Sequence, residues 1–287
     1  MNIQKSKNKQ ENKGTLFICA TPIGNLEDVS FRLVRILGEV DLIAAEDTRT
    51  IRKLLTRYEI FKKNIVSCHN YSSESKIAHI CQRLEEGANV ALVSESGMPA
   101  IQDPGYRLIN KCIEKGIPLE VIPGPNAAVS ALVLAGLSTD SFLFAGFPPK
   151  AKTKRKKKLT ELAMFPYTII FYESPNRVKR FLAELKESMG DRKACLAREI
   201  TKLYEEIIRG SLSSILSELK EREIKGEIVV VVEGYRGERI KNYTEDDLKE
   251  KLLGLLAQNI SKKNALKIIL ARYDIDRQTL YNISTKI

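Results

Sequence analysis

The sequence predicts an α/β protein with two α/β domains followed by a small helical module. From residue 15 to residue 232, short apolar runs alternate with longer segments in which apolar residues recur at helical spacing. Beyond residue 235 only the helical spacing continues. The chain has 287 residues, of which 43% are hydrophobic, so it is long enough for two domains with a substantial core.

The segment 89–115 is the clearest example of this alternation. Residues 89–94 form a short apolar run that is typical of a buried strand in a parallel sheet. A loop with two Gly and two Pro follows at 95–105, and we expect Asp103 to cap the next helix, with Pro104 at its first position. Strand, Gly-rich loop and helix in this order are typical of a small-molecule site, although a plain strand–helix connection has the same order.

The first domain is expected to cover residues 14–146, behind a basic tail at residues 1–13 that we predict to be disordered. Its strands are expected at 15–20, 40–45, 65–68, 89–94, 119–122 and 142–145, and its helices at 30–37, 51–58, 74–86, 104–115 and 127–135. Three of the strands end in Pro/Gly loops, at 21–26, 95–105 and 123–126. Because parallel strands end at one edge of their sheet, we expect these three loops to line one pocket.

The second domain is expected to cover residues 147–238, after a linker at 146–150 that contains two consecutive Pro. Its strands are expected at 167–172, 194–197, 206–209 and 227–232, and its helices at 152–164, 175–190 and 213–223. The strand at 227–232 is apolar enough to lie at the centre of a sheet.

The last segment, 239–287, is expected to form three helices at 244–257, 261–273 and 277–283. Thr244 and Asp247 have the spacing of an N-terminal capping pair. Three short helices with several Lys and Arg are similar to a helix-turn-helix module. A structural cap or a dimer arm is an equally good interpretation.

The positive charge is unevenly distributed. The formal net charge is +11, and the segment 152–158 has basic residues at every position except Thr153. The tail and the last helices hold most of the remaining excess, so the rest of the chain is close to neutral. A dense basic cluster on a neutral body favours a polyanionic partner such as RNA, with a solvated charge run as the alternative. The expected RNA contacts are Lys152, Lys154, Arg155, Lys156, Lys157 and Lys158.

Several classes of protein are disfavoured. The five Cys include no C-x-x-C pair and there are only two His, so no metal site is expected and the thiols are predicted to be reduced core residues. No signal peptide or membrane span is evident, and we expect a cytoplasmic protein without a membrane partner. The absence of G-x-G-x-x-G and of a Walker lysine loop disfavours a standard nucleotide site.

Five motifs together resemble the tetrapyrrole-methylase superfamily over residues 15–235. They are Thr15 to Asp28, Ala44-Ala-Glu-Asp-Thr-Arg49, Pro123-Gly-Pro-Asn-Ala127, Phe171-Tyr-Glu-Ser-Pro-Asn-Arg177 and Ala197 to Glu206. One loop departs from the family, which usually has Ser-Asp-Ala-Gly-Thr-Pro where this chain has Ser94-Glu-Ser-Gly-Met-Pro99. The Gly and Pro that shape the turn are kept.

The resemblance implies S-adenosylmethionine held between two α/β domains of a homodimer. Within the superfamily, the motifs are similar to members that methylate the ribose 2′-hydroxyl of a cytidine in 16S ribosomal RNA. The cofactor contacts that the resemblance implies are Pro22, Ile23, Gly24, Ser96, Gly97, Met98, Ile101, Asn126, Ala127, Glu173 and Ile200.

A ribose hydroxyl is a weak nucleophile, so positioning and a nearby base would assist its methylation. Among the polar residues at strand ends, we select Arg49, Glu199 and Lys202 as candidate catalytic residues, with Lys202 as a possible base oriented by a carboxylate. Helix capping and ion pairing are the structural alternatives for each of them. Two other functions stay open: methylation of a small molecule such as a tetrapyrrole, and RNA binding without catalysis.

Overall fold

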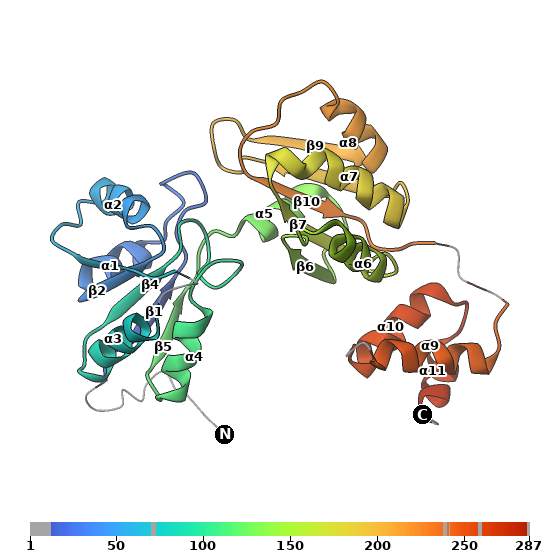
Figure 1. The fold of residues 1–287 in the computed structure, drawn as a ribbon, viewed down its shortest axis with the longest axis horizontal. Helices are drawn as coiled ribbons and strands as arrows, with labels where there is room; N and C mark the ends of the chain where they lie inside the picture. The colour runs from blue at the N-terminus through green and yellow to red at the C-terminus, as the bar shows by residue number, and fades with distance from the viewer. Residues whose placement is uncertain (1–12, 70–72, 238–239, 241, 258–259, 286–287) are drawn as a thin grey trace. The chain divides into compact units, whose positions relative to one another are not determined.

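The computed structural model describes residues 13–69, 73–237, 240, 242–257 and 260–285 (Figure 1). The chain divides into two compact units. Unit 1 contains the described residues up to Ser130 together with Glu199–Glu205, and unit 2 contains Ala131–Arg198 and the described residues from Glu206 onward. Residues 1–12 of the predicted disordered tail lie outside the described residues, whereas the Nζ of Lys13 donates to the carbonyl of Lys115 at 2.8 Å.

Unit 1 is built on a parallel sheet of five strands in the order β3-β2-β4-β1-β5. The strands are β1 (Leu16–Cys19), β2 (Leu42–Ala45), β3 (Asn64–Ser67), β4 (Val90–Val93) and β5 (Leu119–Ile122). All four residues of β4 are buried, and β4 is the central strand of the sheet. The prediction from its continuous apolar run is therefore confirmed.

Helices cover both faces of this sheet (Figure 1). They are α1 (Phe31–Glu39), α2 (Thr48–Arg57), α3 (Glu74–Glu85), α4 (Tyr106–Glu114) and α5 (Ala127–Ala135), which runs into unit 2. The apolar stripes of α1 and α2 pack in one core cluster with Ile43 and Ala91, and those of α3 and α4 pack in another with Leu42 and Leu92. Neighbouring residues of a strand thus face opposite helix layers.

Two helix starts differ from the sequence prediction. The prediction of Asp103 as the N-cap of α4 is wrong: the helix begins at Tyr106 after Gly105, whose φ of 136° is not helical. Pro104 therefore belongs to the preceding loop. Helix α2 begins three residues earlier than predicted, because the side chain of Asp47 accepts a hydrogen bond from the backbone N–H of Arg49 and caps the helix.

Unit 2 contains a mixed sheet in the order β6-β7-β10-β8-β9. Its strands are β6 (Phe142–Gly146), β7 (Thr168–Glu173), β8 (Lys193–Arg198), β9 (Glu206–Ser211) and β10 (Ile228–Val232). Strand β10 is central and fully buried, as predicted, and it is antiparallel to both of its neighbours. The first domain was expected to extend to residue 146, whereas β6 pairs with β7 in this second sheet.

Three helices pack on the sheet of unit 2: α6 (Lys152–Leu162), α7 (Pro175–Met189) and α8 (Leu212–Leu219). Their buried side chains share one core cluster with the strands, centred on residues such as Phe171 and Phe181. Helix α8 ends four residues before the predicted end.

The last three helices form a core cluster of their own. They are α9 (Glu245–Ala257), α10 (Lys262–Arg272) and α11 (Arg277–Ser284), close to their predicted positions. The capping pair is confirmed: the N–H of Thr244 donates to Asp247 at 2.8 Å, and the N–H of Asp247 donates to Thr244 Oγ1 at 3.2 Å. The predicted boundary at 238–239 lies outside the described residues.

All five cysteines are buried free thiols, as predicted. Among the described residues, no helix is long and apolar enough to cross a membrane. The same part of the chain contains no group of three or more His, Cys, Asp or Glu that could hold a metal ion.

Candidate active site

Three loops meet at the carboxyl edge of the sheet in unit 1. Strand β1 lies between β4 and β5, and Cys19 at its end is level with Val93 and Ile122. The loops that follow these residues therefore leave the sheet at one height. The first two loops are joined by a pair of hydrogen bonds, in which Thr21 N donates to Gly97 O at 2.9 Å and Gly97 N donates to Thr21 O at 3.1 Å.

Glycines make this close approach possible. A Cβ added at Gly97 would lie 3.3 Å from Ile23 Cγ2 and 3.6 Å from the carbonyl oxygen of Pro125. A Cβ added at Gly124 would lie 3.0 Å from the Cβ of Ala20. The loops at 21–26, 95–105 and 123–126 therefore form one rim, which confirms that they leave the sheet at the same edge; that they line a pocket stays a prediction.

The second loop holds an unusual backbone conformation. Gly97 and Gly105 have positive φ, and so do Ala100 and Gln102, both at 67°. A left-handed conformation costs a non-glycine residue about 1–2 kcal/mol. Ser94, which is buried, holds the loop by donating from its Oγ to the carbonyl of Gly97 at 3.0 Å. The fold thus keeps a strained loop where a ligand site is expected.

A distant segment, Glu199–Glu205, joins the first loop of the rim within unit 1. The backbone N–H of Asn25 donates to Thr201 Oγ1 at 3.1 Å. A Cβ added at Gly24 would collide with the side chain of Lys202. The Nζ of Lys202 in turn donates to Glu199 Oε1 at 2.9 Å. Two candidate catalytic residues therefore lie beside the first Pro/Gly loop.

The third candidate, Arg49, lies at the start of α2. Its side chain is 87% exposed and pairs with Asp47 at 2.9 Å. The hydrogen bonds from the Arg49 side chain and backbone lower the pKa of Asp47 to about 2, so this carboxylate is ionised at neutral pH. The strand before it, β2, is paired with β4, and the N–H of Glu95 donates to Glu46 Oε2 at 3.3 Å. The start of α2 thus adjoins the second loop.

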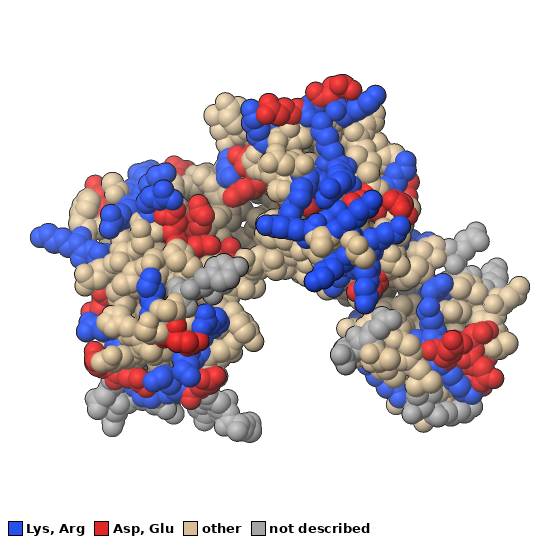
Figure 2. All heavy atoms as spheres, viewed as in Figure 1, with Lys and Arg blue, Asp and Glu red and all other residues tan. Residues whose placement is uncertain are grey.

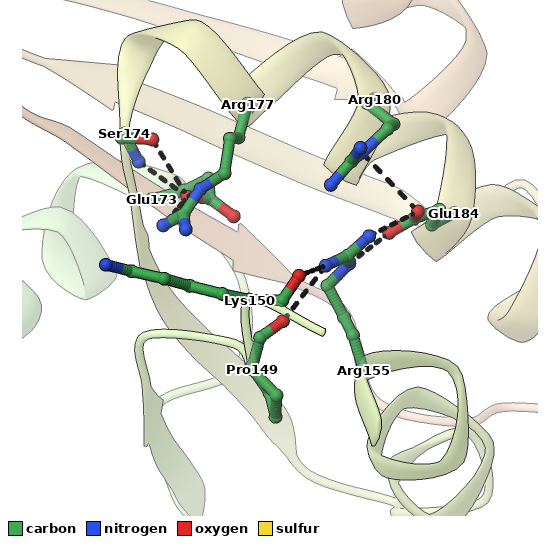
Figure 3. A network of polar contacts seen from close by, with 8 residues as sticks. All are labelled: Pro149, Lys150, Arg155, Glu173, Ser174, Arg177, Arg180 and Glu184. Carbon is green, nitrogen blue, oxygen red and sulfur yellow. Dashed lines mark hydrogen bonds and ion pairs between the residues drawn. The ribbon is translucent and has the colours of Figure 1, made fainter. Parts of the chain in front are cut away.

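In unit 2, Glu173 and Arg155 belong to a polar network (Figure 3). Glu173 Oε1 accepts hydrogen bonds from the N–H of Ser174 at 2.7 Å and from Arg177 Nε at 2.8 Å. Arg155 is 3% exposed and donates to both oxygens of Glu184 and to the carbonyls of Pro149 and Lys150. Arg155 therefore anchors α6 internally, whereas the lysines around it are exposed.

The structure brings most of the predicted cofactor residues together. All of them except Glu173 belong to unit 1. Asn126 also caps α5, since its Oδ1 accepts from the N–H of Val129 at 3.1 Å. Thr21, Ser94 and Thr201, which shape the rim through hydrogen bonds, were not predicted from the sequence. Their short polar side chains beside Pro/Gly loops could have indicated this role.

The model of the family Tetrapyrrole (Corrin/Porphyrin) Methylases matches residues 15–216. The chain belongs to the tetrapyrrole methylase family. The methyltransferase CobJ has the same fold, with a TM-score of 0.59 at 20% sequence identity, over 79% of this chain and 97% of that one.

Within the tetrapyrrole methylase family, the chain is similar to proteins named ribosomal RNA small subunit methyltransferase I. The one from Halalkalibacterium halodurans is 43% identical over 289 residues, which cover 99% of each chain. The one from Thermotoga maritima is 43% identical over 221 residues, which cover 77% of this chain and 99% of that protein. This tetrapyrrole methylase is accordingly an S-adenosylmethionine-dependent methyltransferase.

The residues of the rim fit that cofactor. Ile101 is 41% exposed, so its apolar side chain is accessible to a ligand at the rim. The polar groups of the Pro/Gly loops are backbone amides and carbonyls, which suit the amino-acid end of the cofactor. Gly97 leaves the space that a Cβ would fill beside Ile23. The cofactor supplies an electrophilic methyl group when bound.

Proposed function

We propose that this methyltransferase modifies the ribose 2′-hydroxyl of a cytidine in 16S ribosomal RNA. The observation that carries the proposal is the 43% identity over nearly the whole length of both chains to a ribosomal RNA small subunit methyltransferase I. Because that similarity covers the last three helices, which follow the residues 15–216 matched by the family model, it extends beyond the part common to the methylase family.

The lysines of α6 support an RNA substrate. Lys152, Lys154, Lys157 and Lys158 are exposed, and Lys156 pairs with Glu187 at 3.3 Å while both side chains stay 68% exposed. Figure 2 shows Lys and Arg gathered over α6 and α7. Exposed ammonium groups bind phosphates by releasing counterions from the nucleic acid. We assign the lysines of α6 to the RNA backbone and leave the buried Arg155 out of that role.

We assign the chemical roles as follows. Lys202, held by Glu199, stabilises the negative charge that develops on the ribose oxygen, and Glu199 takes up the proton that the hydroxyl loses when its oxygen is methylated. Arg49 positions the substrate from the start of α2. Most of the rate enhancement would come from alignment of the ribose oxygen with the methyl group.

We further propose that the enzyme is a homodimer. Val129 and Val133 lie four residues apart on α5 and are 48% and 70% exposed. Val121 is exposed on β5, the edge strand of the sheet in unit 1. Exposed apolar side chains one turn apart on a helix, such as Val129 and Val133, are typical of an interface between copies of a chain. Sedimentation of the purified protein tests this, and a monomer at micromolar concentration would contradict it.

Mass spectrometry of modified RNA tests the substrate. The purified enzyme is incubated with methyl-labelled cofactor and either free 16S ribosomal RNA or 30S subunits, both taken from cells that lack this gene. We expect one 2′-O-methylcytidine in nuclease fragments of the RNA. Labelled base, or label only on a tetrapyrrole offered in parallel, would contradict the proposal. The variant Lys202→Met should lower the initial rate of RNA methylation by about 10²–10³-fold. Lys225→Met, at a side chain 75% exposed, is the matched control.

A further inference from the structure

Helix α2 carries a second concentration of positive charge, separate from α6. Its sequence, Thr-Arg-Thr-Ile-Arg-Lys-Leu-Leu-Thr-Arg, contains four cations and no Asp or Glu. Ile51, Leu54 and Leu55 face the core, whereas Arg49, Arg52, Lys53 and Arg57 are exposed. We call these four residues the α2 basic face. Figure 2 shows Lys and Arg gathered over this helix.

The spacing of these cations follows the helix. Arg49, Lys53 and Arg57 succeed one another at four-residue intervals, so they form a line with steps of about 6 Å along the axis. Arg52 lies beside this line. Arg49 pairs with Asp47, and Arg57 lies over the ring of Tyr58 at 5.9 Å. Within the described part of the chain, no Asp or Glu forms an ion pair with Arg52 or Lys53.

The α2 basic face begins at the candidate active site. Strand β2, which precedes α2, runs parallel to β4 and ends level with it, at the edge where the Pro/Gly loops leave the sheet. The contact between Glu95 and Glu46 joins the start of α2 to the second loop. A polyanion bound along α2 would therefore extend away from the rim.

We propose that the α2 basic face is a second binding surface for the sugar–phosphate backbone of the substrate RNA, next to the methylated nucleotide. This inference rests on the proposed function, since it requires an RNA substrate. A line of exposed cations without carboxylates on the same helix is the complement of a phosphate backbone. Arg presents a planar fork that binds phosphate oxygens in pairs.

Removal of charge from the α2 basic face should change the salt dependence of RNA binding by a definite amount. Each phosphate contact to single-stranded nucleic acid contributes about 0.7 to the slope of log affinity against log salt concentration. The loss of two contacts should therefore reduce the slope by about 1.4 and weaken binding by about 25-fold at 0.1 M salt.

The experiment compares two double variants with the unmodified protein. Arg52→Gln with Lys53→Gln removes two charges from the α2 basic face and leaves Arg49 in place. Arg35→Gln with Lys111→Gln removes the same charge from exposed residues of α1 and α4 that pair with Glu39 and Glu114. Affinity for a 16S ribosomal RNA fragment is measured at several salt concentrations, and cofactor affinity is measured by calorimetry.

We expect the α2 variant to show the reduced salt slope and the weaker RNA affinity given above, with unchanged cofactor affinity. The control variant should bind RNA about as the unmodified protein does. An α2 variant with an unchanged slope, or a control with an equal loss, would overturn the inference. Failure of the proposed function is a separate result, since the unmodified protein would then bind and methylate no 16S ribosomal RNA.

Discussion

Thr21 and Gly97 pair like two residues of neighbouring antiparallel strands, with N–H to O distances of 2.9 and 3.1 Å. They follow two strands that run parallel, so the pairing requires both loops to turn toward each other directly after the sheet ends. Gly97 meets this requirement with a φ of 77°. The rim therefore depends on a conformation that other residues adopt only with strain.

Replacement of Gly97 by Val should damage both the fold and the cofactor site. The positive φ costs a β-branched residue about 2 kcal/mol or more, and the new side chain would press on Ile23. We expect a loss of about 2–3 kcal/mol in the free energy of unfolding, measured with urea, and at least a tenfold loss of cofactor affinity. Gly38→Ala is the control: Gly38 lies in α1 with no atom within 4 Å of an added Cβ, and should gain about 0.5–1 kcal/mol.

The Glu199–Lys202 pair should act in the chemical step. Lys202→Met and Glu199→Gln should each lower kcat by about 10²–10³, the first through loss of a donor to the developing oxyanion and the second through loss of the acceptor for the hydroxyl proton. Cofactor affinity should stay within about threefold, because cofactor contacts are assigned to other residues. Single-turnover kinetics and calorimetry measure the two quantities. An unchanged kcat in either variant would remove that residue from the mechanism.

The Arg155–Glu184 pair should stabilise unit 2 in a pH-dependent way. The hydrogen bond from Arg155 lowers the pKa of Glu184 below its ordinary value of 4.5. Glu184 is therefore deprotonated more easily in the folded state than in the unfolded state. Its contribution to the free energy of unfolding is complete above pH 4.5 and is lost as the pH falls through the lower pKa of the folded state. Urea unfolding at a series of pH values should show this loss, which Glu184→Gln should abolish.

Removal of Arg155 should be far more costly than removal of its neighbour Lys156. Arg155→Met leaves two carbonyls without this donor and Glu184 with only the longer contact to Arg180 at 3.7 Å. We expect a loss of about 2–4 kcal/mol in the free energy of unfolding. Lys156→Met removes an exposed ion pair worth less than about 1 kcal/mol. Equal effects of the two substitutions would contradict the assignment of Arg155 as an internal anchor.

A chain that ends after Arg236 should still fold and bind the cofactor. The last three helices have a core cluster of their own, and the relative from Thermotoga maritima is matched over 99% of its length by only 77% of this chain. Calorimetry with the cofactor should give an affinity within about twofold of the full chain. A loss of oligomerisation or of RNA affinity would separate the dimer-arm interpretation from the helix-turn-helix interpretation.

Features that depend on local physics were predictable from the sequence. The apolar runs located the strands, because burial on both faces of a parallel sheet requires continuous hydrophobicity. The Pro/Gly loops at 21–26, 95–105 and 123–126 located the rim, because they interrupt the chain where strands end. The capping pair of Thr244 and Asp247 was also predictable, because a capping box is recognised by the three-residue spacing of its members at the start of a helix.

Features that depend on distant partners were not predictable. Nothing in Phe142–Gly146 itself specifies that it pairs with β7, and the burial of Arg155 depends on Glu184 in another helix. Asp103 was mistaken for a cap because the φ of Gly105 cannot be read from its identity. The α2 basic face was missed because the net charge was summed over a long part of the chain. Acidic residues outside α2 cancel its positive charge in that sum.

The membership of Glu199–Glu205 in unit 1 has a consequence for biosynthesis. When the first 130 residues of the nascent chain have emerged from the ribosome, every strand of the first sheet is present. Thr201 and Lys202 have not yet been synthesised or are still inside the ribosome. The edge of that sheet that carries the candidate active site is complete only after three of the five strands of the second sheet have been translated. Nascent chains should therefore acquire a packed first sheet well before they acquire any capacity for methyl transfer.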